Sequence, residues 1–582
     1  MNLKSILPIL DWLPNYKKEW LKGDIGAGLT VGVMLIPQGM AYASIAGLPA
    51  VYGLYASIVP ILIYAFFGTS RQLAVGPVAM VSLLTATAIG SFQGLSTSDY
   101  ISYAILLALL VGAIQFLLGI FRLGFLVNFL SHPVVSGFTS AAALIIGLSQ
   151  LKHLLGVNIP RSHHVHEILL NAIERSNDIN WIALTIGFGG IFIIIISKKL
   201  KKSLPGQLFA VIFGILAVTL FGLGNGDKAV DIVKDIPSSL PSFVIPTFNI
   251  EIIQLLVPMA LTISLISFME SIAVAKAIQT KHRDYKVVPN QELISLGLAN
   301  VFGSFFQSYP TTGGFSRTAV NEQSEAKTPL ASLISAAIIA LTLLFLTPVF
   351  YYLPKAVLAA IIMVAVFGLL DFSIPKQLLK FSKRDLVILN VTLLVTATVG
   401  IKEGIFIGVV LSLIMLIYKS TKPHIAILGK VPNTHFYRNR KRFKDVEIHN
   451  EILIIRFDAQ LHFANTTYFK DKLQEFSIYK GEELKLLIID GESINSLDSS
   501  AIYALIEILD YFNRKKVTIA FTGLKGPVRD KMIKSGFMEK ANEDLFFMSI
   551  QEAVDWYHTG FQQEKFHKYI KQESAKKSLF NR

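Results

Sequence analysis

Long apolar runs, separated by short polar stretches, constrain this chain more than any other feature of its sequence. A helix that crosses a bilayer needs roughly 20 mostly apolar residues. Eleven runs come close to this length or exceed it, at 25–46, 52–68, 101–120, 129–150, 181–197, 207–223, 252–277, 330–350, 356–370, 386–400 and 405–418. Three more are too short or too polar to span alone: 77–89, 293–306 and 314–320. Together these segments predict an α-helical polytopic membrane protein with fourteen elements and both chain ends on one side.

Composition and charge agree with this fold class. Hydrophobic residues make up 52% of the 582 residues and charged residues only 16%, whereas a soluble protein carries about a quarter charged residues. The net charge of +14 comes from short basic clusters between apolar runs, a pattern that orients membrane proteins. We therefore expect cytoplasmic termini, contact with membrane lipid and no nucleic-acid partner.

Hydrophobic periodicity changes near residue 420, where an ordinary soluble pattern begins. Strands are predicted at 452–457, 484–489 and 517–522, and helices at 468–476, 499–513, 527–535 and 550–558. This alternation predicts a small α/β domain. The expected organisation is an interfacial segment 1–22, a transmembrane domain 23–420, a basic linker 421–445, a cytoplasmic α/β domain 446–560 and a tail 561–582. The linker is either solvated or in contact with anionic lipid.

Two of the weak segments, 77–89 and 314–320, occupy matching places in the chain. They are the third and tenth elements, so each is third in a set of seven, and each follows a stretch rich in Gly and Pro. Paired, interrupted helices in two halves indicate a transporter site built on inverted repeats. Ordinary kinked helices are the alternative.

Arg317 is a cation within the second of these segments. A charge at membrane depth costs at least a few kcal/mol and usually marks a site or a pathway. Two helix N-termini, near Pro77 and Gly314, would each add roughly half a positive charge, and with Arg317 the sum of about +2 balances a dianion. Ser316 adds a hydroxyl donor. The alternative is an arginine that extends to the membrane interface.

Three further polar residues lie within apolar runs. Gln38 and Tyr42 share a helix face, and Pro37 beside them is expected to break the helix. The alternative role for Gln38 is a hydrogen bond to a neighbouring helix. Glu270 lies beside a stripe of serines, and it is either a proton-binding carboxylate or the salt-bridge partner of Arg317.

Nothing in the sequence indicates catalysis, a cofactor or a metal. There is no Cys, which excludes thiolate ligands and disulfides. His163, His164 and His166 lack acidic partners at ligand spacing and are predicted to lie in a solvated outer loop. No P-loop, GxSxG or HExxH pattern is present. An enzyme is therefore not expected.

Several longer blocks resemble the SulP family of anion transporters. They are 36–42 (IPQGMAY), 48–55 (LPAVYGLY), 68–77 (GTSRQLAVGP), 300–306 (NVFGSFF) and 314–327 (GFSRTAVNEQSEAK), the last closest to the proton-coupled plant-type branch. The resemblance implies seven-plus-seven inverted repeats, with a core domain that moves against a gate domain. It places the expected substrate site at Gln38, Tyr42, Gly76, Val78, Gly314, Phe315, Ser316 and Arg317, and makes Glu270 the proton-coupling carboxylate.

The C-terminal region resembles the STAS domain that follows the membrane part in this family. Residues 497–501 (LDSSA) are similar to a strand-to-helix turn that is phosphorylated in related soluble regulators, which would make Ser500 a regulatory site. Alternatively, Ser499 or Ser500 caps the helix, and we predict the cap.

The resulting hypothesis is a homodimeric sulfate–proton symporter of the cell inner membrane that works by alternating access. A sodium-coupled bicarbonate or dicarboxylate carrier and a membrane sensor that signals through the STAS domain remain alternatives.

Overall fold

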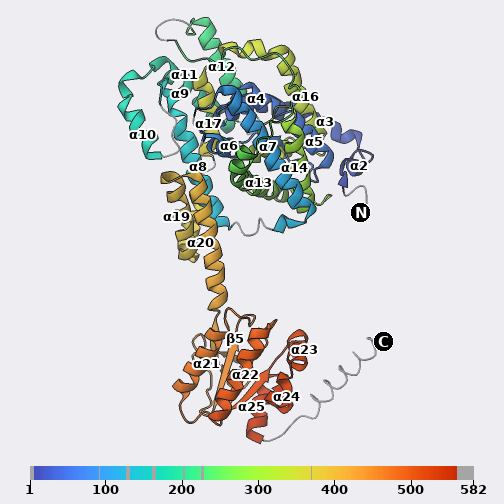
Figure 1. Ribbon diagram of the computed structural model, residues 1–582, viewed down its shortest axis with the longest axis vertical. Helices are drawn as coiled ribbons and strands as arrows, with labels where there is room; N and C mark the ends of the chain where they lie inside the picture. The colour runs from blue at the N-terminus through green and yellow to red at the C-terminus, as the bar shows by residue number, and fades with distance from the viewer. Residues whose placement is uncertain are drawn as a thin grey trace. The chain divides into compact units, whose positions relative to one another are not determined.

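The computed structural model describes residues 6–90, 92, 94–125, 131–159, 165–200, 204–224, 229–282, 284–368 and 370–559, except for the side chain of Lys402. The chain divides into two compact units, Met1–Ser412 and Leu413–Arg582. The first, blue to yellow in Figure 1, is a bundle of helices, and the second, orange to red, is built on a sheet.

Helices form almost all of the first unit. They are α2 (Ile9–Trp12), η1 (Lys18–Trp20), α3 (Leu21–Ile45), α4 (Val51–Tyr55), α5 (Val59–Phe67), α6 (Ala79–Gly90), α7 (Thr97–Ile120), α8 (His132–Ser149), α9 (Leu151–Leu155), α10 (Val165–Glu174), η3 (Ser176–Asp178), α11 (Trp181–Leu200), α12 (Gly206–Leu220), α13 (Ile250–Gln279), α14 (Pro289–Ser304), α15 (Phe315–Gln323), α16 (Leu330–Leu341), η4 (Thr342–Leu346), η5 (Thr347–Tyr352), α17 (Lys355–Phe367), α18 (Ser373–Phe381), α19 (Lys383–Thr398) and α20 (Ile401–Thr421). Helix α20 continues into the second unit.

Seven helices among the described residues are long and apolar enough to cross a membrane. All fourteen predicted segments are helical, and the predicted polytopic fold is confirmed. Pro37 does not break its helix as expected, because α3 runs without interruption from Leu21 to Ile45. The amphipathic helices α10 and α18 were not predicted, since a search for apolar runs does not detect them. His166 lies in α10 rather than in a loop, and His163 and His164 lie outside the described residues.

A short extended crossing places the third and tenth elements side by side. Strand β1 (Val75–Gly76) pairs antiparallel with β2 (Thr312–Gly313), with Val75 opposite Gly313. The Gly314 amide donates to the Ala74 carbonyl at 2.8 Å. Helices α6 and α15 begin just after these strands, so each is a half-helix whose N-terminus lies inside the bundle. Each of these two helices is short because part of its element is an extended strand instead of helix.

Contacts divide the membrane helices into two groups. In one group, α14 packs on α7 and α5, α16 packs along α3, and α13 contacts α6, α7 and α15. In the other, α8 packs on α19 and α17, and α11 packs on α12 and α17. The half-helices α6 and α15 belong to the first group, and α3 and α6 also contact helices of the second.

The second unit has a six-stranded sheet in the order β4-β3-β5-β6-β7-β8. The strands are β3 (Ile425–Lys430), β4 (Tyr437–Asn439), β5 (Ile452–Phe457), β6 (Leu486–Asp490), β7 (Thr518–Thr522) and β8 (Phe546–Phe547). Helices α21 (Thr466–Lys480), α22 (Ser499–Arg514), α23 (Gly526–Lys534), α24 (Phe537–Ala541), η6 (Glu543–Leu545) and α25 (Ile550–Thr559) complete it. The apolar residues of β5, β6 and β7 form its core.

The predicted basic linker 421–445 is wrong, because it contains β3 and β4. Strand β3 pairs antiparallel with both β5 and β4, so this stretch is part of the sheet. Its basic residues hid the strands from a search for apolar alternation: Arg438 lies exposed in β4, between the buried Tyr437 and Asn439.

Candidate functional site

The guanidinium of Arg317 lies buried at the crossing of the two half-helices. Its side chain comes from the first turn of α15, and the residue is 1% exposed. Nη1 donates to the Pro77 carbonyl, just before α6, at 2.8 Å. Nε and Nη2 have no hydrogen-bond partner among the described residues. Because unpaired buried donors are costly, this cation can accept an anion.

Two glycines let this guanidinium lie against the backbone. A Cβ atom at Gly314 would lie 2.8 Å from Arg317 Nη2, and one at Gly76 would lie 3.4 Å from the same atom. Gly76 also has a φ of +146°, which side-chain-bearing residues rarely adopt. The backbone conformation therefore favours glycine at position 76, and the close approach of the guanidinium favours glycine at position 314.

Helix α3 contributes Gln38 and Tyr42 to the same region. They are 1% and 5% exposed, and α3 packs against α15. Gln38 Oε1 has no hydrogen-bond partner among the described residues, so the alternative of a bond from a neighbouring helix to this oxygen is not observed. Tyr42 lies close enough to Arg317 and Glu270 to interact with both electrostatically. The structure thus brings together Arg317, Tyr42 and Glu270, and Gln38 lies one helical turn before Tyr42 on α3.

Glu270 approaches from α13. Its Oε2 atom is buried and has no hydrogen-bond partner in the described part of the chain, and the carboxylate makes no ion pair with Arg317. The salt-bridge alternative is therefore not observed, although the two charges interact at longer range. The neighbouring Ser271 anchors α13 to the crossing, since its Oγ accepts from the Gly313 amide at 2.8 Å.

Other buried carboxylates of this unit differ from Glu270 because they are fully hydrogen-bonded. Glu292 accepts from the Tyr64 hydroxyl, the Thr69 amide and hydroxyl, and the Ser70 amide. Asp24 accepts from the Lys327 amide, the Thr328 amide and hydroxyl, and the Tyr16 hydroxyl. These two carboxylates are structural. Glu270 retains an unused oxygen.

Three predicted site residues are more exposed than the buried side chains around Arg317. Phe315 is 61% exposed, Ser316 is also exposed, and Val78 is partly buried. Successive residues of α15 point in different directions, so Arg317 faces inward while the two residues before it, Phe315 and Ser316, do not. An anion that reaches Arg317 from the side of these two residues would pass the Ser316 hydroxyl.

Sequence reasoning missed a buried tyrosine near the site. Tyr309 is 1% exposed, shares a 3.0 Å hydrogen bond with Ser82 of α6, and interacts electrostatically with Arg317. Its position beside Pro310, in the turn before β2, was the available signal.

A polar network behind the crossing was also missed. Asn300 accepts from the Thr311 amide at 2.7 Å and donates to Gln115, which donates to Ser267. This chain of bonds ties α14, α7 and α13 to β2. Polar residues inside apolar runs were the signal here.

In the second unit, the predicted capping serine is wrong. Asp498 is the N-cap of α22, and its carboxylate accepts from the Ala501 amide at 2.8 Å. Aspartate satisfies an unpaired helix amide as well as serine does. Ser499 and Ser500 are therefore exposed residues of the first helical turn.

Half-helices that meet inside a membrane bundle, with an unsatisfied cation between their N-termini, define a multi-pass membrane transporter of anions. Comparison with known proteins gives the family. Residues 21–392 match the sulfate permease family and residues 443–553 match the STAS domain. The chain belongs to the sulfate permease (SulP) family, whose members are transporters and not enzymes.

Curated relatives and solved structures cover nearly the whole chain. It is 39% identical to "Sulfate transporter 4.1, chloroplastic" of Arabidopsis thaliana, over 95% of this chain and 82% of that one. It is 34% identical to "High affinity sulfate transporter 2" of Stylosanthes hamata, over 96% and 87%. The murine Slc26a9 anion transporter in the inward-facing state matches with a TM-score of 0.87 and 27% identity, over 95% and 94%. The transmembrane domain of the cyanobacterial bicarbonate transporter BicA shares the fold, with a TM-score of 0.59 and 23% identity, over 68% and 98%.

Proposed function

We propose that this transporter carries sulfate, or a similar oxyanion, together with protons by alternating access. The observation that carries the proposal is the pair of unsatisfied groups at the crossing, the Arg317 guanidinium and the Glu270 carboxyl. The named activities of the relatives from Arabidopsis and Stylosanthes support sulfate as the substrate.

Charge balance supports a dianion at Arg317. The N-termini of α6 and α15 supply roughly half a positive charge each, which with the guanidinium gives about +2. Gln38, Tyr42, Gly76, Val78, Gly314, Phe315, Ser316 and Arg317 would surround the bound anion. Amide and hydroxyl donors from this set replace part of the anion's hydration.

Repulsion between charges supports the proton. At about 5 Å and an effective dielectric of 20, a dianion and an ionised Glu270 would repel by roughly 6–7 kcal/mol. Protonation of Glu270 removes this repulsion, so anion and proton bind together. In the other direction, loss of the proton expels the anion. The two helix groups would supply the alternating movement, with α6 and α15 carrying the site against α8, α11, α12, α17 and α19.

The decisive experiment is uptake of labelled sulfate into proteoliposomes with imposed gradients. We expect an inward proton gradient to concentrate sulfate, with no requirement for sodium. The fold is shared with a bicarbonate transporter, so bicarbonate and a sodium gradient are tested in parallel. Uptake that requires sodium and does not change with the proton gradient would favour the sodium-coupled carrier. No uptake of any oxyanion would favour a sensor that signals through the STAS domain.

We also propose an inner-membrane location with cytoplasmic termini and STAS domain, a homodimeric assembly, and regulation at Ser500. Ser500 is exposed in the first turn of α22, where the helix dipole would stabilise an added phosphate. Ser500→Glu should change the uptake rate without loss of folding, and Ser499→Glu, at the exposed neighbouring position of the same helical turn, is the control. An unchanged uptake rate in Ser500→Glu would show that Ser500 is not a regulatory site.

A further inference from the structure

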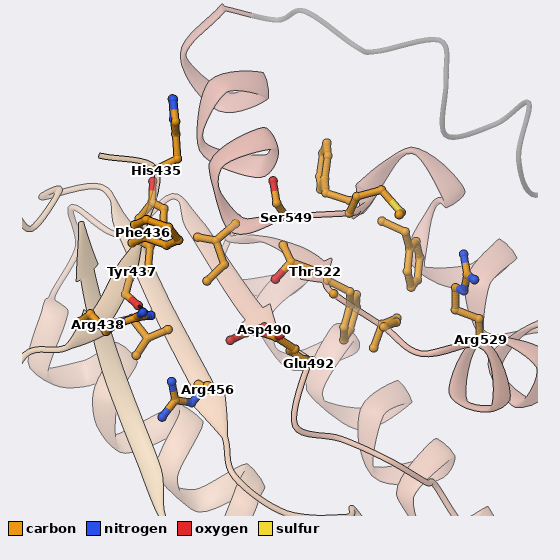
Figure 2. Close-up of a pocket in the computed structure, with 18 residues that line it drawn as sticks. His435, Phe436, Tyr437, Arg438, Arg456, Asp490, Glu492, Thr522, Arg529 and Ser549 are labelled. Atoms are coloured by element: carbon orange, nitrogen blue, oxygen red, sulfur yellow. Dashed lines mark hydrogen bonds between the residues drawn. The ribbon is translucent and has the colours of Figure 1, made fainter. Parts of the chain in front are cut away.

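A cavity of about 470 Å³ lies in the second unit at the carboxyl ends of β5, β6 and β7 (Figure 2). This volume falls within the ~300–1,000 Å³ range of small-molecule sites. Ligands of open parallel sheets bind outside the carboxyl ends of the strands. All of the residues that line the cavity belong to the second unit.

The floor of the cavity has two buried polar side chains. Asp490 and Thr522 are paired neighbours on β6 and β7, and they are 4% and 0% exposed. Thr522 Oγ1 has no hydrogen-bond partner in the described part of the chain. Among the described residues, Asp490 accepts a single hydrogen bond, from the amide of Glu492 at 3.2 Å. A ligand group that donates hydrogen bonds would satisfy both residues.

Cationic groups border the same cavity. Arg456 is the register partner of Asp490 on β5. Its Nε and Nη2 bind Asp458 at 2.5 and 3.2 Å, which leaves Nη1 for another acceptor. Arg438 extends from the exposed face of β4. Figure 2 shows Asp490 and Thr522 between these two arginines and Arg529. The N-terminus of α25, at Ile550, also borders the cavity and favours negative charge.

Both signs of charge within an apolar enclosure narrow the class of ligand. The remaining walls come largely from aromatic side chains, among them Phe436, Phe521, Phe546 and Phe547. Burial raises the pKa of Asp490 above its ordinary value, so a cationic ligand group beside it would offset the cost of its charge. An inorganic dianion would leave the apolar walls uncovered and meet the Asp490 carboxylate. A zwitterion with an apolar body would pair with Asp490, Thr522 and the arginines and cover the aromatic walls.

We propose that this cavity binds a free α-amino acid with an apolar side chain. The ammonium group contacts Asp490 and Thr522, the carboxylate contacts Arg456 and Arg438, and the side chain packs on the phenylalanines. The STAS domain would then report an amino acid to the transporter that contains it.

The test is calorimetric titration of the full-length protein in nanodiscs in a sulfate-free buffer, with sulfate titrated separately as a probe of its own. Each of the twenty protein amino acids is the probe in turn, followed by the N-acetyl and amide derivatives of the tightest binder. We expect an apolar amino acid to bind, and each derivative to bind about tenfold more weakly or worse, because each loses a charged hydrogen-bonding group.

Variants localise the binding. Asp490→Asn and Arg438→Gln should each weaken binding about tenfold or more, whereas Asp510→Asn, which removes an exposed carboxylate paired with Lys540, should not. Asn keeps the shape of Asp490 and removes a costly buried charge, so the variant should fold. The proposal is overturned if no amino acid binds, if the binder keeps its affinity in Asp490→Asn, or if adenosine monophosphate or sulfate occupies the cavity instead.

Discussion

Arg317 is buried, and so is the Oε2 atom of the partly buried Glu270, and both side chains have atoms without hydrogen-bond partners among the described residues. The proposed transport depends on these two side chains. A charged residue at membrane depth costs at least a few kcal/mol. These two groups therefore destabilise the empty transporter, and a bound anion and a proton would offset this cost in free energy. Their neighbours Glu292 and Asp24 show that the same bundle satisfies a carboxylate fully when it is structural.

Arg317→Ala should weaken sulfate binding by at least about 30-fold, which corresponds to about 2 kcal/mol, because half of the site's positive charge disappears. Binding is measured by titration of the purified protein, and folding by its thermal transition. Lys281→Ala is the matched control, since it removes an exposed cation paired with Glu322. Affinity within a few-fold of the original protein would show that Arg317 is not the anion-binding residue.

Glu270→Gln mimics the protonated carboxyl and keeps its shape. The variant should bind sulfate and exchange it across the membrane, yet lose acceleration by an inward proton gradient. Counterflow and gradient-driven uptake are measured side by side, with Glu251→Gln at the exposed start of the same helix as the control. If the Glu270 variant still concentrates sulfate in response to pH, another group couples the proton.

At the scale of elements, the paired strands β1 and β2 determine where both half-helices begin. Their antiparallel register fixes Gly76 opposite Thr312 and holds the N-termini of α6 and α15 at the crossing. Ser271 and the Asn300 network hold α13 and α14 against β2. A small displacement of these strands would therefore move the guanidinium that is proposed to bind the anion.

Gly314→Ala tests this geometry. The new Cβ would lie 2.8 Å from Arg317 Nη2 and displace the guanidinium, so sulfate affinity should fall about tenfold or more while the helices remain folded. Gly26→Ala in α3 is the control, because nothing lies within 4 Å of its Cβ position. Equal affinities in the two variants would show that the close approach at Gly314 is not required.

At the scale of the whole molecule, the boundary between the units is set by the sheet and not by composition. Strands β3 and β4 belong with β5, although they lie in the basic stretch that follows the last membrane helix. Any attempt to separate the units has to respect this pairing.

Two truncations should therefore behave differently. A chain that ends after Lys444 keeps β3 and β4 but loses β5, so it exposes unpaired strand edges and should aggregate. A chain that ends after Lys422 removes the whole sheet and should remain monodisperse, with transport that is impaired or deregulated. Size-exclusion chromatography and uptake at several pH values measure both effects. Unaltered rate and pH response in the shorter chain would remove the regulatory role.

Apolar patterns and isolated polar residues were enough to predict the membrane fold and most of the residues at the crossing. Apolar runs are local signals, because each helix must satisfy its own backbone in lipid. A buried cation such as Arg317 stands out for the same reason, and so does Glu270. The resemblance of the longer blocks added Val78 to the site and identified the predicted soluble domain as a STAS domain.

The way in which these groups meet could be seen only in the folded chain. The pairing of Val75 with Gly313 joins segments more than 200 residues apart, and no local pattern encodes such a register. Tyr309 and Asn300 look ordinary until the fold buries them beside the crossing. Strand β3 forms because β5 pairs with it, and β4 forms on the other side of β3. Asp490 and Thr522 form the floor of a cavity because parallel strands end together. Each of these features depends on a partner distant in sequence, and its stability comes from burial that the isolated segment lacks.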